Sequence, residues 1–196
     1  MLTRIHCDKF ASFIDNKTVL FQSGLNIVLG QDDKANSIGK STLLLIIDFC
    51  FGGSSYADKN SDVIQNIGDH SIDFAFRFDG RDYYFSRDTS SPKQYWECDS
   101  DFNRIGEAKR IEEFTAFLKA RYLPEGVSQT FREVVSRFMR INGKNNYNVS
   151  KPLRGGDYSD KDSTGITVLE ELFWSRLKLG VNQERSRGCQ TGNQGL

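Results

Sequence analysis

Cysteine and histidine are scarce in this chain, and neither is arranged as a metal site or a disulfide framework. There are four cysteines and two histidines in 196 residues. Cys7, Cys50, Cys98 and Cys189 are widely spaced, and none forms the close pair with another Cys or His that metal sites use. This spacing indicates a protein whose thiols stay reduced, as they do inside cells.

Long hydrophobic runs and an excess of charge of one sign are also missing. The longest apolar stretch, residues 43–51, contains Asp48 and is far too short to cross a bilayer. Charged residues interrupt the first positions and argue against a signal peptide, so we expect a cytoplasmic protein with no membrane partner. The 26 basic and 26 acidic residues give a formal net charge of zero, which does not favour nucleic-acid binding through bulk charge.

The most informative segment is a strand–loop–helix pattern near the N-terminus. An apolar run at 25–29 leads into a polar loop that ends in Gly-Lys-Ser-Thr at 39–42, and an apolar helix follows. This order is the context of a phosphate-binding loop. In such a loop, backbone N–H groups and the positive end of the helix dipole face the phosphates. The segment 30–42 therefore predicts a nucleoside triphosphate site.

The residue types in this loop suggest separate roles. Lys40 is placed to reach the β- and γ-phosphates, and the Ser41 hydroxyl is placed to ligate Mg²⁺. The backbone N–H groups of residues 39–41 would surround the phosphates. The predicted nucleotide-binding residues are Gly30, Asn36, Ser37, Ile38, Gly39, Lys40, Ser41 and Thr42, with Ser41 as the magnesium ligand.

The loop departs from the standard spacing. Four residues usually separate the first glycine from Gly-Lys-Ser, whereas eight separate Gly30 from Gly39. Either the loop carries an insertion, or its backbone reaches the phosphates differently. Asn36 could replace one glycine, because asparagine tolerates left-handed conformations.

The remaining patterns predict an α/β protein. The run at 25–29 is nearly continuous in apolar residues, which is typical of a strand buried on both faces. The helix from Lys40 should end at Gly52-Gly53, and 54–66 should be a loop. Other strands are expected at 2–7, 17–21, 72–78, 83–85 and 95–98, with a tight turn at Asp79-Gly80.

Two further helices are expected after the strands. One carries Ile111, Phe114, Phe117 and Leu118 on one face. The second starts at a capping box formed by Thr130 and Glu133 and runs to about Ile141. Its arginines, Arg132, Arg137 and Arg140, lie off the apolar stripe and either cover a solvated surface or contact phosphate.

The N-terminal part resembles the ABC-type ATPase heads of the SMC, RecN and SbcC group of chromosome and DNA-repair proteins. The resemblance rests on the Phe-containing turn at 9–13, on Gly-Leu-Asn at 24–26, and on Asn-Ser-Ile-Gly-Lys-Ser-Thr at 36–42. It is strong over 1–52 and loose from there to 172. Among these proteins the chain looks closest to uncharacterised bacterial SMC-like proteins with an enlarged loop.

This resemblance implies both a fold and a function. The fold would be a P-loop NTPase, specifically the N-terminal lobe of an ABC-type head with an antiparallel β-subdomain over 1–172. Residues 173–196 would form a disordered tail or an aberrant C-terminus. The implied cofactors are ATP and Mg²⁺. The implied partners are a second ATPase head and, through a complete assembly, DNA, with a role in DNA repair or defence.

An ABC-type ATPase also needs a signature motif and a strand that ends in acidic residues. This sequence contains only segments that look like them. Leu-Arg-Gly-Gly-Asp at 153–157 imitates the signature, but no apolar-faced helix follows it. Glu170 and Glu171 imitate the acidic end of a strand, yet Thr-Val-Leu-Glu at 167–170 is better explained as a capping box that begins a helix. We therefore expect ATP binding without efficient hydrolysis by this chain alone.

Several alternatives remain open from the sequence. A truncation, an artificial boundary or a frameshift would each explain a lobe that lacks its other half. The chain could instead be a non-catalytic regulatory or interaction module derived from such a head. A small-molecule kinase fits less well, because strands precede Gly30.

Overall fold

The computed structural model describes residues 1–196 except 12–13, 29–37, 60, 140–162, 164 and 174–196. The chain divides into two compact units, Met1–Phe117 and Leu118–Leu196. The boundary falls inside a helix that spans Ile111–Tyr122.

The elements follow one another as a short N-terminal pair of strands, three helices, four more strands and two helices. They are β1 (Leu2–His6), the 3₁₀ turn η1 (Asp15–Lys17), β2 (Thr18–Leu20), α1 (Ile38–Cys50), α2 (Ser55–Lys59), α3 (Ser61–Ile67), β3 (Ser71–Phe78), β4 (Arg81–Asp88), β5 (Gln94–Cys98), β6 (Arg104–Arg110), α4 (Ile111–Tyr122) and α5 (Phe131–Phe138). Residues 165–173 are also helical.

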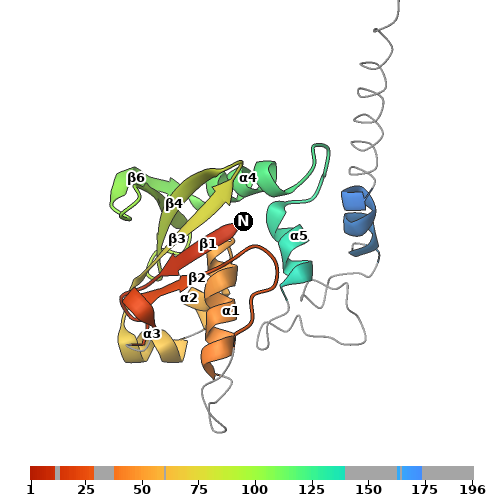
Figure 1. Ribbon diagram of the computed structural model, residues 1–196. Helices are drawn as coiled ribbons and strands as arrows, with labels where there is room; N and C mark the ends of the chain where they lie inside the picture. Colours follow the sequence, from red (N-terminus) through yellow and green to blue (C-terminus); the bar gives the residue numbers. More distant parts are fainter. Residues whose placement is uncertain (12–13, 29–37, 60, 140–162, 164, 174–196) are drawn as a thin grey trace, which may run out of the picture. The chain divides into compact units, whose positions relative to one another are not determined.

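The first unit is built on one antiparallel sheet (Figure 1). Its six strands lie in the order β2-β1-β3-β4-β5-β6. The central β3–β4 hairpin turns at Asp79 and Gly80, whose φ angles of 50° and 77° are the positive values that a tight two-residue turn requires. The predicted α/β class, the antiparallel sheet and this hairpin are confirmed.

An aromatic core covers one face of the sheet. Phe74 and Phe76 of β3 share this face because alternate residues of a strand point the same way. Phe114 of α4 packs against both, and its ring centroid lies 5.0 Å from that of Phe85 on β4. Phe51, just after α1, meets Phe76 edge-on at 5.2 Å. The high phenylalanine content of the chain is therefore used to bind α1 and α4 to the sheet.

The C-terminal end of α1 is closed by a glycine cap. The Gly52 N–H donates to the Phe49 carbonyl at 3.0 Å and the Gly53 N–H to the Asp48 carbonyl at 2.9 Å. Gly52 has the positive φ, 86°, that this motif needs. A Cβ at Gly53 would lie 2.0 Å from Asp48 Oδ2, so the position accepts only glycine. The helix end predicted at Gly52-Gly53 is confirmed.

Arg87 of β4 is fully buried at this helix end. Its guanidinium donates to the carbonyl oxygens of Phe49, Gly53 and Pro92. The guanidinium carbon also lies 3.8 Å from the centroid of the Phe49 ring. A buried charge is tolerated where it is hydrogen-bonded in this way. Arg87 therefore ties the end of α1 to the sheet, and Asp48, also fully buried, adds a carboxylate at the same helix end.

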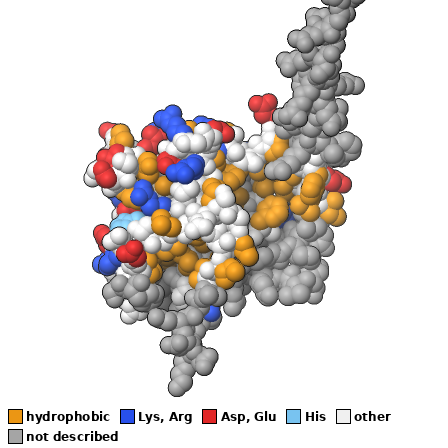
Figure 2. Space-filling view, in the orientation of Figure 1, with side chains coloured by type: hydrophobic (Ala, Val, Ile, Leu, Met, Phe, Trp, Pro, Cys, Tyr) orange, Lys and Arg blue, Asp and Glu red, His pale blue; other side chains and the backbone are white. Residues whose placement is uncertain are grey.

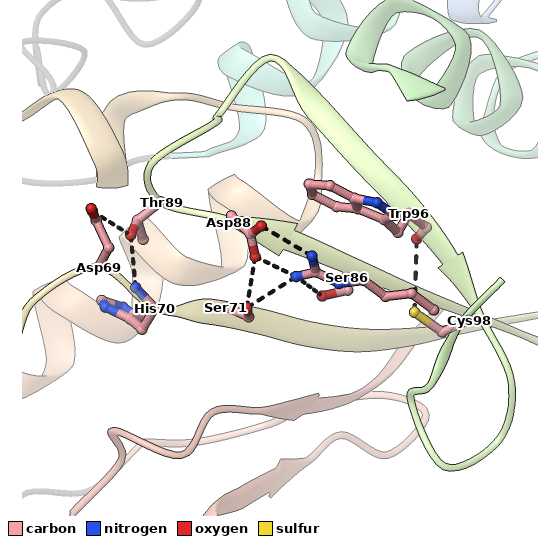
Figure 3. Close-up of polar contacts among 9 residues, drawn as sticks. Asp69, His70, Ser71, Ser86, Asp88, Thr89, Trp96 and Cys98 are labelled. Carbon is pink, nitrogen blue, oxygen red and sulfur yellow. Dashed lines mark hydrogen bonds and ion pairs between the residues drawn. The ribbon is translucent and has the colours of Figure 1, made fainter. Parts of the chain in front are cut away.

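The opposite face of the sheet carries a polar network (Figure 3). Arg104 of β6 reaches over the sheet and pairs with the Asp88 carboxylate. The same guanidinium donates to the Ser71 and Ser86 hydroxyls at 3.1 and 3.3 Å. It also stacks 4.0 Å over the Trp96 ring. This network holds β6, a strand that was not predicted because its mostly exposed residues show no apolar alternation.

The segment expected to be a loop at 54–66 contains the short helices α2 and α3, so this prediction is wrong. Its polar composition gives no sign of helix. One aromatic anchor, Tyr56, is 2% exposed and packs edge-on against Phe49 at 5.9 Å. The Tyr56 hydroxyl also bonds the His70 Nε2 at 2.8 Å. Tertiary burial of this one side chain overrides the local pattern.

The apolar run at 25–29 was expected to be a buried strand, and its described part is not a strand. Residues 25–28 have no regular secondary structure. Leu25, Ile27 and Val28 are 85%, 68% and 45% exposed. A strand buried on both faces needs a neighbour on each side. Among the described residues, no strand pairs with this segment, so its apolar side chains remain in solvent.

The second unit is built around α5 and the helical residues 165–173. The predicted capping box is confirmed: the Glu133 N–H donates to Thr130 Oγ1 at 3.2 Å, and the Thr130 N–H donates to Glu133 Oε2 at 2.7 Å. Val127, Val134 and Val168 form the apolar cluster of this unit. The helix predicted at 167–170 is confirmed, but the predicted capping box there is wrong. Thr167 lies inside the helix, and its hydroxyl donates to the Ser163 carbonyl at 3.0 Å.

The arginines of α5 differ from one another. Arg137 is only 7% exposed, so the prediction that it covers a solvated surface is wrong for this residue. It continues the buried row Phe131–Val134 with the same spacing of three residues, which places it inside the helix stripe. Arg132 is half-buried, and Arg140 lies outside the described residues. The helix ends at Phe138, before the predicted end at Ile141, which also lies outside them.

The predicted division into a lobe at 1–172 and a tail at 173–196 stays a prediction. Residues 174–196 lie outside the described part of the chain. The same holds for Leu-Arg-Gly-Gly-Asp at 153–157, which was set aside as a signature motif from its sequence alone.

Replacing Arg87 with methionine should lower the free energy of unfolding by on the order of 3 kcal/mol, because it leaves buried carbonyl oxygens without donors. Chemical denaturation of the full chain measures this change. The matched control is Arg77→Met, since Arg77 is exposed and its side chain pairs with Asp82 at the surface. That change should cost less than about 1 kcal/mol. Equal losses for the two variants would contradict the role of Arg87.

Candidate functional site

The first turn of α1 is where the structure places the Gly-Lys-Ser-Thr sequence. The helix begins at Ile38 and is 13 residues long, with no acidic residue in its first turn. The first N–H groups of a helix have no partner within the helix. Together with the positive end of the helix dipole, they attract anions. The helix start therefore has the electrostatics that a phosphate group requires.

Lys40 and Ser41 have free polar groups within the described part of the chain. Both side chains are half-buried, and neither the Lys40 amine nor the Ser41 hydroxyl makes a hydrogen bond or ion pair there. Thr42 is half-buried too and has an interaction of its own. An ammonium and a hydroxyl held on a helix start without protein partners can serve a phosphate and its metal ion.

Gly39 stands in open space at the start of the helix. A Cβ built there would meet no atom within 4 Å, in contrast to the crowded position of Gly53. Packing of the chain therefore gives no reason for a glycine at this position. A phosphate group that approaches the backbone closely gives one.

Four of the eight predicted nucleotide-binding residues can be placed with their side chains. Gly39, Lys40, Ser41 and Thr42 follow one another on the first turn of α1. Ile38 begins that helix, and only its backbone is described. Gly30, Asn36 and Ser37 lie outside the described residues, as does most of the enlarged loop, so its path to the phosphates stays open.

The acidic residues that imitate the end of a catalytic strand lie on a helix instead. The Glu171 carboxylate accepts hydrogen bonds from the Ser128 N–H and hydroxyl, both at 2.9 Å. These bonds hold the pKa of Glu171 below its usual range. Glu170 is exposed on the same helix. The prediction of a helix here is confirmed, and Glu171 has a structural partner within its own unit.

Sequence reasoning missed the residues that fix the far end of α1. Neither Arg87 nor Asp48 was singled out, although both are fully buried. The residue pattern of β4 could have indicated that Arg87 is buried. Tyr83, Phe85 and Arg87 alternate along the strand, so Arg87 had to point to the same face as Phe85. An arginine on the core face of a central strand is a candidate for a buried hydrogen-bonding role.

The chain matches the AAA domain family over residues 4–186, and it belongs to that family. The match spans the sheet, α1 and the helices of the second unit. It establishes the class of the protein as an ATPase-type, nucleotide-binding P-loop domain, in agreement with the pattern at 30–42.

The described residues contain neither a metal-binding cluster nor a membrane-spanning helix. Within that part of the chain, His, Cys, Asp and Glu side chains nowhere gather in a group of three that could hold a metal. The Mg²⁺ site predicted at Ser41 is of another kind, because Mg²⁺ in P-loop sites takes much of its coordination from substrate oxygens and water. None of the helices described has the length and hydrophobicity needed to span a bilayer.

Gly39→Ala should change the free energy of unfolding by less than about 1 kcal/mol, because the new methyl group meets nothing and alanine favours helix. The contrasting variant is Gly53→Ala, whose methyl group collides with Asp48 and should cost about 1–3 kcal/mol. Thermal and urea unfolding of both proteins measure the difference. Similar losses in the two would show that Gly39 is needed for packing.

Proposed function

We propose that this chain binds ATP with Mg²⁺ as the N-terminal half of an SMC/RecN-like ATPase head. The observation that carries the proposal is the start of α1, where Lys40 and Ser41 have no partners among the described residues on a helix turn free of acidic residues. Membership of the AAA domain family supports the nucleotide class. The resemblance at 36–42 and 24–26 supports the SMC-like assignment.

The residues on the helix start have distinct tasks in this proposal. The Lys40 ammonium offsets charge on the β- and γ-phosphates, and the backbone N–H groups of residues 39–41 orient the phosphate chain. The Ser41 hydroxyl holds Mg²⁺, which would neutralise phosphate charge. Gly39 leaves room for the phosphates to approach the backbone. These tasks are binding and positioning, and none of them activates water.

The wider role of this head would lie in DNA repair or defence. A second ATPase head is the proposed partner, and DNA would be contacted through the complete assembly. The balanced charge of the chain supports an indirect contact of this kind, since its 26 basic and 26 acidic residues give no excess that would attract DNA by itself.

The alternative is a regulatory or interaction module that binds nucleotide without hydrolysing it. One observation favours this alternative. Glu171, the acidic residue most like a general base in the sequence, is hydrogen-bonded to Ser128 and lies on a helix. Both hypotheses predict nucleotide binding, and they differ in whether a further polypeptide restores hydrolysis.

Lys40→Ala should abolish Mg-ATP binding and leave the fold intact, because Lys40 is half-buried at a helix start and has no partner in the described chain. Calorimetric titration with Mg-ATP measures the affinity, and circular dichroism checks the fold. The control is Lys93→Ala, an exposed lysine outside α1, which should bind like the parent protein. Unchanged affinity in Lys40→Ala would refute the phosphate-loop assignment.

The purified chain should show negligible ATP turnover even where it binds ATP. Positioning and charge neutralisation provide part of phosphoryl-transfer catalysis, but a residue that orients the attacking water is also needed. Phosphate release under steady-state conditions measures turnover. Turnover that is present in the parent chain and lost in Glu171→Gln would show that Glu171 has a catalytic role, in conflict with its bonds to Ser128.

A further inference from the structure

A contact between Tyr56 of α2 and His70, which lies just before β3, has no part in the proposed nucleotide site. The Tyr56 side chain is 2% exposed, and its hydroxyl lies 2.8 Å from His70 Nε2. The two rings also meet edge-on, with centroids 5.7 Å apart. The Tyr56 ring packs against Phe49 of α1 as well, at 5.9 Å. Tyr56 therefore fastens the short helix α2 both to His70 and to the end of α1. We call the Tyr56–His70 contact the clasp.

The other ring nitrogen of His70 sets the direction of the hydrogen bond in the clasp. His70 Nδ1 lies 2.9 Å from the Gly68 carbonyl oxygen, and a carbonyl oxygen can only accept. Nδ1 therefore carries a hydrogen, and in the neutral imidazole Nε2 is left with a lone pair. This lone pair accepts from the Tyr56 hydroxyl. Burial raises the pKa of Tyr56, so the hydroxyl keeps the proton that it donates.

The clasp fits only the neutral form of His70. A protonated imidazole carries a hydrogen on Nε2 as well, so two donors would face each other. The Tyr56 hydroxyl would then have to turn its hydrogen elsewhere, and among the described residues it has no hydrogen bond besides the one to His70. A buried donor that loses its acceptor is unfavourable. Protonation of His70 and the closed clasp therefore oppose each other.

The charged groups around the clasp do not keep a proton away from His70. The Asp69 carboxylate accepts from the Thr89 hydroxyl at 3.2 Å, and Thr89 Oγ1 accepts from the His70 N–H at 3.0 Å (Figure 3). Within the described residues, the titratable groups on the elements around the clasp are Cys7, Asp48, Asp58, Asp69, Arg87 and Asp88. Most of them are carboxylates, which attract an imidazolium, and burial raises the pKa of the Cys7 thiol. His70 is half-buried, so solvent can supply the proton.

We propose that the clasp is a pH-sensitive switch, in which proton uptake by His70 breaks the contact with Tyr56 and releases α2 from the end of α1. Histidine side chains ordinarily titrate at about pH 6.5. The clasp is closed above this range and opens as the pH falls through it. The release stays local, because Arg87 and the glycine cap hold the end of α1 independently of α2. The switch does not depend on nucleotide binding.

His6 offers a matched control, because it is the only other histidine in the chain. Histidine covers only a small spot on the face shown in Figure 2. The Thr18 hydroxyl donates to the Asn16 carbonyl at 2.9 Å, so at 3.0 Å it accepts from His6 Nδ1. His6 Nε2 then faces the Asp8 carboxylate at 3.4 Å, which can accept a new hydrogen. Protonation of His6 therefore breaks no hydrogen bond.

Amide hydrogen exchange followed by NMR tests the switch on the full chain without nucleotide. The reporter is the Asp58 N–H of α2, which donates to the Ser54 carbonyl at 2.9 Å. The reference is the Thr89 N–H, which donates to the His70 carbonyl at 3.0 Å. Protection factors, corrected for the intrinsic pH dependence of exchange, are compared at about pH 7.5 and about pH 5.5. Protection of Asp58 should fall about tenfold at the lower pH, and protection of Thr89 should change by less than about twofold.

Three variants identify the groups responsible. His70→Gln provides a carboxamide oxygen that can accept from the Tyr56 hydroxyl but does not titrate, so Asp58 protection should be the same at both pH values. Tyr56→Phe keeps the ring against Phe49 and removes the hydroxyl, so the pH response should be lost there too. His6→Gln should keep the full response, because His6 has no contact with the clasp.

Four outcomes would overturn the proposal. Asp58 protection that does not change with pH in the parent chain would mean that there is no switch. A response that persists in Tyr56→Phe or in His70→Gln would assign it to another group, and a response lost in His6→Gln would assign it to His6. Equal falls at Asp58 and Thr89 would mean general acid unfolding and no local release. Failure of ATP binding would leave all these results unchanged, so this proposal and the proposed function can fail separately.

Discussion

A buried arginine at the end of α1 is the constraint on which the first unit depends. Arg87 donates to the carbonyl groups of Phe49, Gly53 and Pro92, and so it joins the last turn of the helix to the sheet. The glycine cap next to it has no space for a side chain at Gly53. Because the helix is a rigid rod, a fixed C-terminal end also fixes the direction in which its N-terminal turn presents Lys40.

The two ends of α1 thus differ in a way that matters for function. The C-terminal end is buried, hydrogen-bonded and closely packed. The N-terminal turn has open space at Gly39, and Lys40 and Ser41 have no partners there among the described residues. A buried end provides stability, and an open end with free donors provides a place for an anion. The same helix therefore serves the core at one end and, in the proposed function, a ligand at the other.

The apolar residues 25–28 after β2 differ from what their composition predicts. Their composition is that of an interior strand, yet Leu25 and Ile27 are in solvent because no described strand lies beside them. Glu171 is likewise engaged with Ser128 and not with a phosphate site. The proposed binding of nucleotide rests on Lys40 and Ser41, which lie on the first turn of α1.

The sequence by itself determined the features that depend on local chemistry. The Gly-Lys-Ser-Thr helix start, the Asp79-Gly80 hairpin, the Gly52-Gly53 helix end and the Thr130 capping box were all predictable, because each uses residues a few positions apart. Only the tertiary structure decided the rest. Arg87 is buried because carbonyl groups distant in the chain accept its hydrogen bonds. Residues 104–110 form the strand β6 because β5 pairs with them. Residues 25–28 stay exposed because no strand among the described residues pairs with them.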